Sequence, residues 1–401
     1  MDNHPQEIIT GEAPVIRLAN LFISEAIQKG ASDIHLEPQK ANLIMRYRID
    51  GILYKMQSFP SSLQEPIISR IKIMASMDLA EKRLPQDGRI TFSLAEVNKT
   101  VDLRISILPS LYGEAVVIRI LDKPAYLLNL SELGFSADMR KEIERIISLP
   151  HGLILVTGPT GSGKSTTLYS WLNHLNKEDR KVVTIEDPVE FEVNRIDQVE
   201  VRPLIGLTFA NVLRSLVRQS PDIIMVGEIR DYETANIAIQ IALTGHLLLS
   251  TLHTNDAPSS ITRLVDMGIP PYLITSTLRA VLAQRLVRLL CPFCKEEYTP
   301  QGIEKAKIQE VFPEEKEPKI FRKKGCFKCD QIGYKGRIGV FELLVVDDTI
   351  KELTLKRATS SLLIQRACSL GMRTLKEDGI KKVLEGKTTL EEVLRVTEIQ
   401  E

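Results

Sequence analysis

The spacing of hydrophobic positions first changes near residue 30. Apolar side chains recur at helical spacing from Val15 to Ile27, and the pattern ends at Gly30, a residue typical of a helix C-cap. The segments that follow read as short strands: DIHLEP, NLIMRYRIDGILYKM and GRITFSLAEVNKTVDLRISIL. Turns are expected at two Asp-Gly pairs, Asp50-Gly51 and Asp87-Gly88. We therefore expect residues 1–122 to form a small α+β domain.

Beyond a linker at residues 123–135, short apolar runs alternate with helical segments. The runs are GLILVTG, KVVTIEDP, DIIMVGE and HLLLSTLH. Such alternation is typical of a parallel sheet covered by helices. We expect this α/β core at residues 136–290, a Cys-, Lys- and Gly-rich subdomain at 291–337 and a helical region at 338–401.

Composition indicates a globular protein with several domains. The chain has 401 residues, 43% of them hydrophobic and 26% charged. Lys plus Arg and Asp plus Glu both total 52, and this zero net charge argues against a general nucleic-acid binder. No apolar run approaches the roughly 20 residues of a membrane span, and MDNHPQEIITGE lacks the regions of a signal peptide. We expect a cytosolic protein whose membrane contacts are peripheral.

The segment GPTGSGKST matches the phosphate-loop pattern G-x4-G-K-[ST], between an apolar strand and a helical segment. Glycines there let successive backbone N–H groups turn toward phosphates, and the helix N-terminus adds positive potential. The strand–loop–helix context argues against the alternative, a flexible Gly/Ser loop. The candidate nucleotide-binding residues are Gly158, Pro159, Thr160, Gly161, Ser162, Gly163, Lys164, Ser165 and Thr166. Lys164 would neutralise the β- and γ-phosphates and Ser165 would ligate Mg²⁺.

Two strand ends carry acids that hydrolysis would need. VVTIEDPVEF contains Glu186 and Glu190, and PDIIMVGEIRD contains Glu228, one residue after a glycine that stands where an aspartate is expected. In open α/β sheets ligands bind at the carboxyl ends of strands, which favours Glu186 and Glu228. Glu190 alone is equally compatible with a solvated loop acid.

Two histidines bracket the most apolar run, TGHLLLSTLHTN. His246 and His253 would lie roughly 20 Å apart at the two ends of a strand, so they do not share a metal ion. Each is compatible with a hydrogen-bonded structural role. The functional alternative is that His253 senses the γ-phosphate or a neighbouring subunit.

Four of the five cysteines form two C-x2-C pairs. CPFC supplies Cys291 and Cys294, and CFKC supplies Cys326 and Cys329. This pattern in a cytosolic chain indicates a four-thiolate zinc site, and four protein ligands make it structural rather than catalytic. A redox pair or disulfides are the alternatives. Cys368 lies in an apolar helix and is expected to be buried.

Arginines are candidates for stabilising charge on a transferring phosphoryl group. The alternative for each is a solvated or salt-bridged surface side chain. The candidates are Arg89 and Arg104 in the first domain, and Arg214, Arg218 and Arg230 in the second.

Four segments resemble, in the same order, the four sequence motifs of the secretion motor ATPases. The segments are GPTGSGKST, TIEDPVEF, IIMVGEIRD and TGHLLLSTLHTN. That family drives type II secretion and type IV pilus assembly. The resemblance extends over nearly the whole chain. It includes GASDIHLEP, RYRIDG and PQDGR upstream of these motifs and the cysteines downstream. It implies an α/β fold: a RecA-like P-loop NTPase domain, a smaller N-terminal α+β (PAS-like) domain, a four-cysteine zinc subdomain and a helical C-terminus.

The resemblance also implies roles for the site residues. Glu186 would orient the attacking water and Glu228 would hold Mg²⁺ through water, although these two roles could be exchanged. Arg89 and Arg104 would reach the nucleotide when the two domains close. The arginines of the second domain would help at the site or the subunit boundary. The implied cofactors are ATP, Mg²⁺ and Zn²⁺.

The function that this resemblance implies is an ATP-hydrolysing motor in a ring, with six copies expected. It would act at the inner face of the cytoplasmic membrane on a platform protein and on pilin or pseudopilin subunits. The rivals are a DNA-uptake or nucleic-acid-translocating ATPase, and a scaffold that binds ATP without turnover. Family members usually carry a further N-terminal docking domain, so either the protein is naturally short or the chain is truncated.

Overall fold

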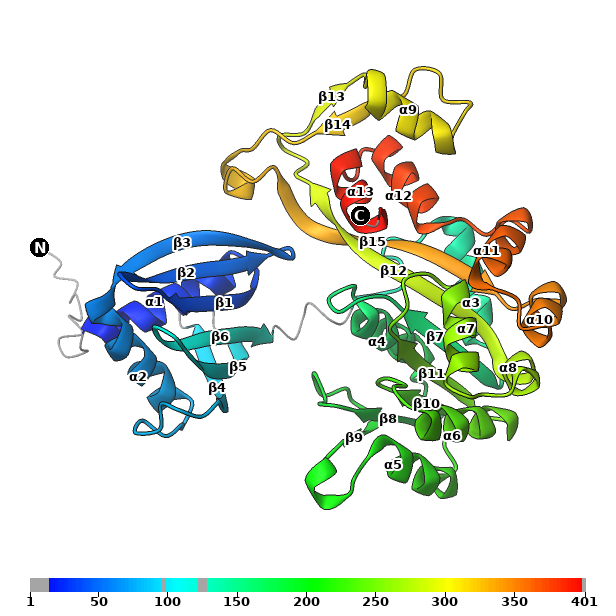
Figure 1. Cartoon of the computed structure of the whole chain (residues 1–401), viewed down its shortest axis with the longest axis horizontal. Coiled ribbons are helices and arrows are strands. Elements are labelled where there is room, and N and C mark those ends of the chain that lie inside the picture. The colour runs from blue at the N-terminus through cyan, green and yellow to red at the C-terminus, as the bar shows by residue number, and fades with distance from the viewer. Residues whose placement is uncertain (1–13, 95–98, 122–127, 399–401) are drawn as a thin grey trace, which may run out of the picture. The chain divides into compact units, whose positions relative to one another are not determined.

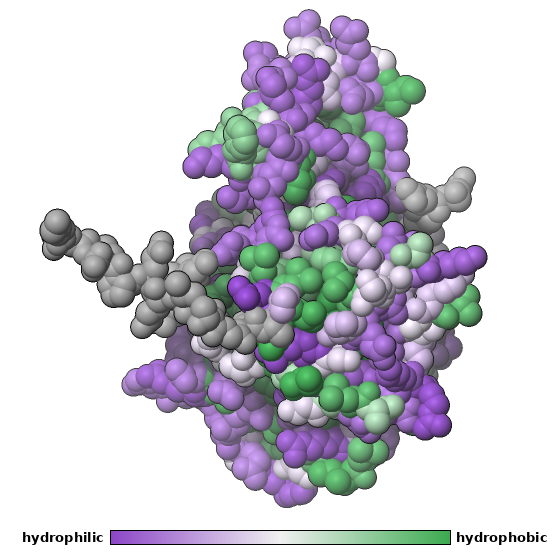
Figure 2. Space-filling view, turned by 90° about the vertical axis from the view of Figure 1, so that its left-hand side faces the viewer, coloured by the Kyte–Doolittle hydropathy of each residue, from purple (hydrophilic) through white to green (hydrophobic). Residues whose placement is uncertain are grey.

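The chain folds into two compact units, Met1–Lys123 and Pro124–Glu401 (Figure 1). The computed structural model describes residues 14–94, 99–121 and 128–398. In these ranges, no helix has the length and hydrophobicity that a membrane span needs. The face drawn in Figure 2 is mostly hydrophilic, with smaller groups of hydrophobic side chains between the polar ones.

The first unit is a six-stranded antiparallel sheet in the order β3-β2-β1-β6-β5-β4. Its strands are β1 (Ala31–Pro38), β2 (Asn42–Ile49), β3 (Ile52–Pro60), β4 (Gln86–Leu94), β5 (Lys99–Ser110) and β6 (Gly113–Leu121). Helices α1 (Pro14–Gln28) and α2 (Gln64–Met74) pack with the sheet's apolar side chains in one core. Burial alternates along β5, as expected of a sheet with one covered face. The predicted helix and strands are therefore present.

The two predicted Asp-Gly turns have different outcomes. Asp50 and Gly51 have positive φ and join β2 to β3, as predicted. The second prediction was wrong, because Asp87 and Gly88 lie within β4 and pair with β5. A Cβ at Gly88 would lie 2.9 Å from the carbonyl oxygen of Ala75, just beyond α2. That position therefore requires glycine for close packing rather than for a turn.

The second unit is built on a seven-stranded sheet in the order β15-β12-β7-β11-β10-β8-β9. The strands are β7 (Gly152–Thr157), β8 (Val182–Glu186), β9 (Ile196–Glu200), β10 (Ile223–Val226), β11 (Leu247–Leu252), β12 (Leu278–Leu290) and β15 (Tyr334–Val345). All neighbouring pairs are parallel except β12 with β15. The four apolar runs of the sequence form β7, β8, β10 and β11, whose residues are all buried.

Helices cover both faces of this sheet, so its strands are buried on both sides. Along β7, Leu153 and Leu155 face the core that includes α5 (Phe209–Leu216), α6 (Tyr232–Leu243), α7 (Pro258–Asp266) and α8 (Pro271–Thr277). Ile154 and Val156 face the core that includes α3 (Ala137–Ile147) and α4 (Lys164–Leu175). This arrangement explains why the runs are continuously apolar rather than alternating.

Strands β12 and β15 form a long antiparallel pair at one edge of the sheet. The cysteine-rich segment lies between them in sequence and contains β13 (Glu296–Tyr298), α9 (Gly302–Val311) and β14 (Ile320–Arg322). Residues 338–345, expected to begin the helical region, instead complete β15, because apolar side chains there pack in the sheet's cores. The helices that follow are α10 (Asp348–Leu355), α11 (Ser360–Ser369), α12 (Leu375–Leu384) and α13 (Leu390–Thr397).

A buried ion pair ties the last helix to the sheet. Arg288 on β12 donates to Glu392 on α13 at 2.7 Å, and Arg395 donates to the same carboxylate at 2.9 Å. Burial alone would raise the pKa of Glu392, but hydrogen bonds from these two arginines hold that pKa at about 2. Glu392 is therefore ionised in the folded protein.

We expect Glu392→Ala to lower the free energy of unfolding of the second unit by about 3–5 kcal/mol, because Arg288 loses its buried partner. Urea unfolding followed by the fluorescence of Trp171, the chain's single tryptophan, measures this change. Glu391→Ala is the matched control, since Glu391 is exposed, and we expect it to change stability by less than about 0.5 kcal/mol. Equal losses in the two variants would contradict the role of the buried pair.

Candidate active site

The phosphate loop joins β7 to α4, with three glycines in left-handed or related backbone conformations. Gly158, Gly161 and Gly163 have φ of 147°, 78° and 87°. A Cβ on Gly158 would lie 2.5 Å from the carbonyl oxygen of Gln284 and 2.7 Å from Ser162 Oγ. The loop can therefore take this path only with glycine at residue 158, and it leads directly into the N-terminus of α4.

Lys164 is the first residue of α4 and folds back over the loop. Its Nζ donates to the carbonyl oxygens of Gly158 at 2.8 Å and Pro159 at 3.1 Å. Burial lowers the pKa of Lys164 to about 8, while the negative charge of Glu228 acts in the opposite direction. The ammonium group therefore remains mostly protonated at pH 7 and can bind an anion at this loop.

Glu228 forms a charged cluster with residues from two neighbouring segments. One carboxylate oxygen pairs with Arg230, and the other lies 3.5 Å from Nε2 of His253, which follows β11. Burial and the charge of Lys164 lower the pKa of His253, so this ring is neutral at pH 7. The structure thus brings together four predicted site residues: Lys164, Glu228, Arg230 and His253. His246 lies before β11, near the carbonyl oxygen of Ile241 at 3.2 Å.

The glycine before Glu228 has a packing explanation. Gly227 donates its N–H to the carbonyl oxygen of Ile185 at 2.8 Å and accepts from the hydroxyl of Thr251 at 2.7 Å. A Cβ at residue 227 would lie 3.3 Å from that same Ile185 oxygen. Position 227 is therefore packed closely between β8 and β11, and the acid of this segment is the next residue, Glu228.

Glu186 has a different environment from Glu228. It ends β8 with only 4% of its surface exposed. Its Oε2 accepts from the hydroxyl of Tyr169. Its Oε1 accepts from the hydroxyl of Thr184 at 2.6 Å and from the amide of Gln198 at 3.1 Å. Neutral donors therefore hold Glu186 in the interior, whereas Glu228 faces cations.

Two further residues lie at the phosphate loop and were not predicted from the sequence. Gln284 on β12 donates to the carbonyl oxygen of Ser162 at 2.7 Å and accepts from the hydroxyl of Thr167 at 2.8 Å. Arg285 donates to the carbonyl oxygen of Asn255 at 2.8 Å, and burial lowers its pKa. Neither residue belongs to a recognisable motif, and only the pairing of β12 with β7 places them here.

The remaining predicted arginines lie elsewhere. Arg214 bonds Asn211 and Glu233 on the surface of α5 and α6, and Arg218 donates to the carbonyl oxygen of Arg214 at 3.1 Å. In the first unit, Arg89 on β4 is directly opposite Arg104 on β5.

Arg104 is in turn opposite a residue that the sequence reasoning missed, Arg119 on β6. Arg119 also pairs with Asp33 on β1 at 3.1 Å. The three arginines therefore form a row across adjacent strands, and such a row concentrates positive charge on this sheet.

The four paired cysteines converge as the sequence predicts. Their sulfur atoms all lie within 4.8 Å of one another. Cys291 and Cys326, and also Cys294 and Cys329, have Sγ atoms 3.8 Å apart. That spacing matches the edge of a ZnS₄ tetrahedron with Zn–S bonds of about 2.3 Å, and it is too long for a disulfide bond of about 2.05 Å. The donor set and its spacing fit zinc.

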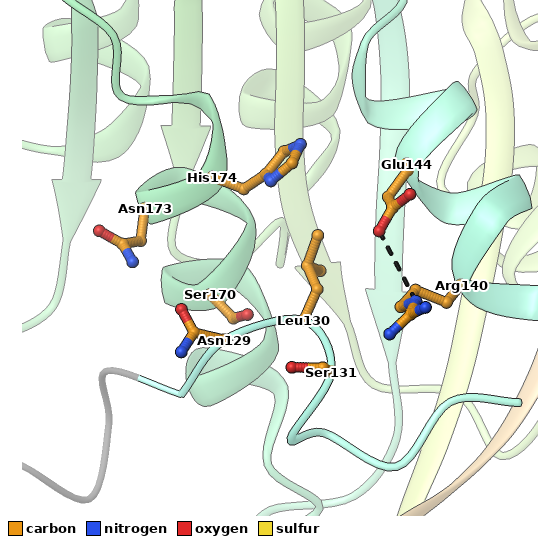
Figure 3. Close-up of a pocket in the computed structure, with 8 residues that line it drawn as sticks. All are labelled: Asn129, Leu130, Ser131, Arg140, Glu144, Ser170, Asn173 and His174. Carbon is orange, nitrogen blue, oxygen red and sulfur yellow. Dashed lines mark ion pairs between the residues drawn. The ribbon is translucent and has the colours of Figure 1, made fainter. Parts of the chain in front are cut away.

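A separate polar pocket of about 260 Å³ lies beside α4 (Figure 3). Its lining comes from α3, α4 and the segment before α3: Asn129, Leu130, Ser131, Arg140, Glu144, Ser170, Asn173 and His174. Arg140 and Glu144 face each other as an ion pair at 3.8 Å. None of the predicted nucleotide, magnesium or zinc residues lines this pocket.

Comparison with known proteins identifies relatives over nearly the whole chain. The family profile described as "Type II/IV secretion system protein" matches residues 9–395. The type II secretion system ATPase E of Vibrio cholerae is 50% identical over 387 residues, covering 96% of this chain and 76% of the relative. The type IV pilus assembly ATPase PilB of Myxococcus xanthus is 49% identical over 385 residues, covering 96% of this chain and 68% of the relative.

Solved structures agree with the expected fold. The pilus retraction motor PilT with bound ADP has a TM-score of 0.62 at 27% identity, covering 97% of this chain and 98% of that chain. The Legionella pneumophila ATPase DotB has a TM-score of 0.68 at 21% identity, covering 99% of this chain and 98% of that chain, and it supports the fold alone. The predicted α/β fold is thus confirmed. With half of its residues identical to curated relatives and a family profile that matches almost end to end, the chain belongs to the type II/IV secretion system protein family.

Proposed function

We propose that this chain is an ATP-hydrolysing motor that powers type II secretion or type IV pilus assembly. The observation that carries the proposal is the convergence of Lys164, Glu228 and His253 at the carboxyl ends of three adjacent strands, β7, β10 and β11. A lysine on a phosphate loop beside an acid and a neutral histidine fits the binding and hydrolysis of a nucleoside triphosphate.

The loop and the first turn of α4 would bind the nucleotide's phosphates. Backbone N–H groups and the helix N-terminus attract the anion, and Lys164 neutralises its β- and γ-phosphates. The Ser165 hydroxyl and the Glu228 carboxylate are oxygen donors of the kind that Mg²⁺ prefers, with Glu228 acting through water. When bound, Mg²⁺ neutralises charge on the transferring phosphoryl group. His253 senses the γ-phosphate through its contact with Glu228.

Hydrolysis also needs a group that orients water and cations that balance developing charge. Glu186 is proposed to orient the attacking water. Arg89 and Arg104, joined by Arg119, are proposed to meet the nucleotide when the two units close, because a row of like charges is stabilised by an anion. Arg230 acts at the site through Glu228, and Arg214 and Arg218 act at the subunit boundary.

The larger assembly is proposed from the relatives. A ring of six copies would pass domain closure to an inner-membrane platform protein and move pilin or pseudopilin subunits. The chain would then work at the inner face of the cytoplasmic membrane, held there by its partners. The relatives are secretion and pilus ATPases, so the alternative of a nucleic-acid-translocating ATPase is not favoured. Zn²⁺ is proposed as a structural ion at the four cysteines, which leave no open ligand position.

The variants Lys164→Ala and Glu228→Gln together test nucleotide binding and ATP hydrolysis. We expect Lys164→Ala to abolish both, because the phosphates lose their main cation. Glu228→Gln should lower kcat about a hundredfold and weaken ATP binding far less, because a group that supports the transition state is lost. Phosphate release and titration with a fluorescent ATP analogue measure the two effects.

Glu178→Gln, which changes an exposed acid, is the control for these variants and should keep wild-type kinetics. Wild-type hydrolysis by Lys164→Ala would refute the proposed activity. A Glu228→Gln variant that loses binding but not kcat would refute the magnesium role.

Gln284→Leu tests the support of the phosphate loop from β12. Both hydrogen bonds of the amide are lost, so we expect nucleotide affinity to fall about tenfold, corresponding to roughly 1.4 kcal/mol. Gln240→Leu makes the same change at an exposed site on α6 and should leave affinity unchanged. Equal affinity of all three proteins for the ATP analogue would show that Gln284 does not support the loop.

Cys294→Ser tests the zinc site. We expect the wild-type protein to carry about one zinc per chain and the variant to lose most of it, because one of four thiolates is missing. Elemental analysis of the purified proteins gives the ratio, and Cys368→Ser, outside the cluster, should retain full zinc. A wild-type protein that purifies without zinc would contradict this proposal.

A further inference from the structure

The segment that carries His253 is bonded directly to the residue before the phosphate loop. This segment, residues 253–257, joins β11 to α7. Thr157 ends β7 and is fully buried. Its Oγ1 accepts from the backbone N–H of Thr254 at 2.8 Å and lies 2.7 Å from the hydroxyl oxygen of Thr254. Because Thr157 directly precedes Gly158 and Thr254 directly follows His253, one side chain connects the two functional segments.

Arg285 on β12 makes a second connection to the 253–257 segment. Its Nη2 donates to the carbonyl oxygen of Asn255 at 2.8 Å, and its Nη1 donates to the carbonyl oxygen of Gln284 at 3.0 Å. The guanidinium also lies against the phosphate loop, because a Cβ built on Gly158 would lie 3.2 Å from Nη1. Arg285 therefore lies between the phosphate loop and the 253–257 segment.

The far end of the segment is held as well. Glu342 on β15 is 4% exposed, and its Oε1 accepts from the backbone N–H of Ala257 at 2.7 Å. The hydroxyl oxygen of Thr254 lies 2.7 Å from that of Ser260, near the start of α7. Side chains from β7, β12 and β15 thus bond the backbone of Thr254, Asn255 and Ala257 in turn.

These connections determine where the ring of His253 lies. The side chain is about half exposed, and its Nε2 lies 3.5 Å from the carboxylate of Glu228. A contact of that length is too weak to hold an exposed ring by itself. The position of the ring therefore depends on the backbone of the 253–257 segment, which Thr157 and Arg285 bond from beside the phosphate loop.

We propose that Thr157 and Arg285 are positioning residues for ATP hydrolysis, which hold the 253–257 segment against the phosphate loop so that His253 stays beside Glu228. The inference rests on the proposed function and adds to it the connection between the phosphate loop and the histidine. When either connection is lost the segment can move, so His253 and Glu228 separate and the chemical step slows. No group that binds phosphate is removed, so nucleotide affinity stays nearly unchanged.

The first test removes the hydroxyl of Thr157. Thr157→Val keeps the size of the side chain and should lower kcat about tenfold, with KM and the affinity for a fluorescent ATP analogue within about twofold of wild type. Thr157→Ser keeps the hydroxyl and should restore kcat. Thr354→Val removes another buried hydroxyl, one on α10 that donates to the carbonyl oxygen of Ile350 at 2.7 Å, and should leave kcat unchanged. Equal kcat values for Thr157→Val and Thr157→Ser would overturn the role of this hydroxyl.

The second test separates the shape of Arg285 from its charge. Arg285→Lys keeps the charge but cannot bond Asn255 and Gln284 at once, so we expect kcat to fall about fivefold and affinity for the ATP analogue to stay within about twofold. Arg279→Lys makes the same change earlier on β12, where Nε donates to the carbonyl oxygen of His151 at 3.4 Å, and should keep wild-type kcat. A loss of affinity with unchanged kcat in Arg285→Lys would show that Arg285 binds the phosphates directly and would overturn its positioning role. Wild-type kinetics in that variant would overturn it as well.

A double-mutant cycle with His253→Gln shows whether Thr157 acts through the histidine. If it does, adding Thr157→Val to His253→Gln lowers kcat by less than about twofold further, because the group being positioned is already changed. A full tenfold loss in both backgrounds overturns the proposal and leaves the ATPase function intact. Wild-type hydrolysis by His253→Gln overturns the role of His253 and of its connections together. Only hydrolysis by Lys164→Ala would overturn the ATPase function itself.

Discussion

The parallel register of β7, β11 and β10 is the constraint on which the site depends. Thr157 at the end of β7 pairs with Leu252 at the end of β11, and Ser250 pairs with Val226 at the end of β10. The carboxyl ends of all three strands therefore lie at the same end of the sheet. The phosphate loop directly follows β7, His253 directly follows β11, and Glu228 lies two residues after the end of β10. A slip of one residue in any strand would exchange the side chains that pack in the two cores and would also displace the residues that follow the strand, so the fit of each side chain to its own core holds the register and with it the site.

Local patterns were enough to predict the parts of this sheet that carry motifs. The four buried strands, the loop and the positions of Glu228 and His253 after the carboxyl ends of their strands follow from apolar runs and from the rule that ligands bind at carboxyl ends. The long pair β12 and β15 could not be predicted in the same way. Leu278–Leu290 mixes apolar residues with Arg279, Gln284, Arg285 and Arg288, and its strand character comes from pairing with β7 and β15. Gln284 and Arg285 reach the loop only through that non-local pairing.

Glycine shows why one sequence pattern can have two physical causes. Gly51 is a turn residue with φ of 87°, as its Asp-Gly pair predicts. Gly88 also follows an aspartate but lies in a strand, where the segment directly after α2 approaches too closely for a side chain. At Gly227 a Cβ would lie 3.3 Å from the carbonyl oxygen of Ile185, which is also a close approach rather than a turn. The sequence contains the glycine in every case, but only the packing of distant segments distinguishes a turn from a close approach.

The pairing of β12 with β15 also joins the nucleotide site to the cysteine cluster. Gln284 supports the phosphate loop, and six residues later β12 ends at Leu290, directly before Cys291. At about 3.3 Å per strand residue, the loop support and the first cysteine are separated by roughly 20 Å of continuous strand. Cys329 lies shortly before β15 begins, so a metal ion at the four cysteines would close the chain between the two strands. Closing that connection restricts the unfolded chain and favours the paired strands. The ion would thereby help to hold β12, and through Gln284 the phosphate loop, in place without touching the nucleotide.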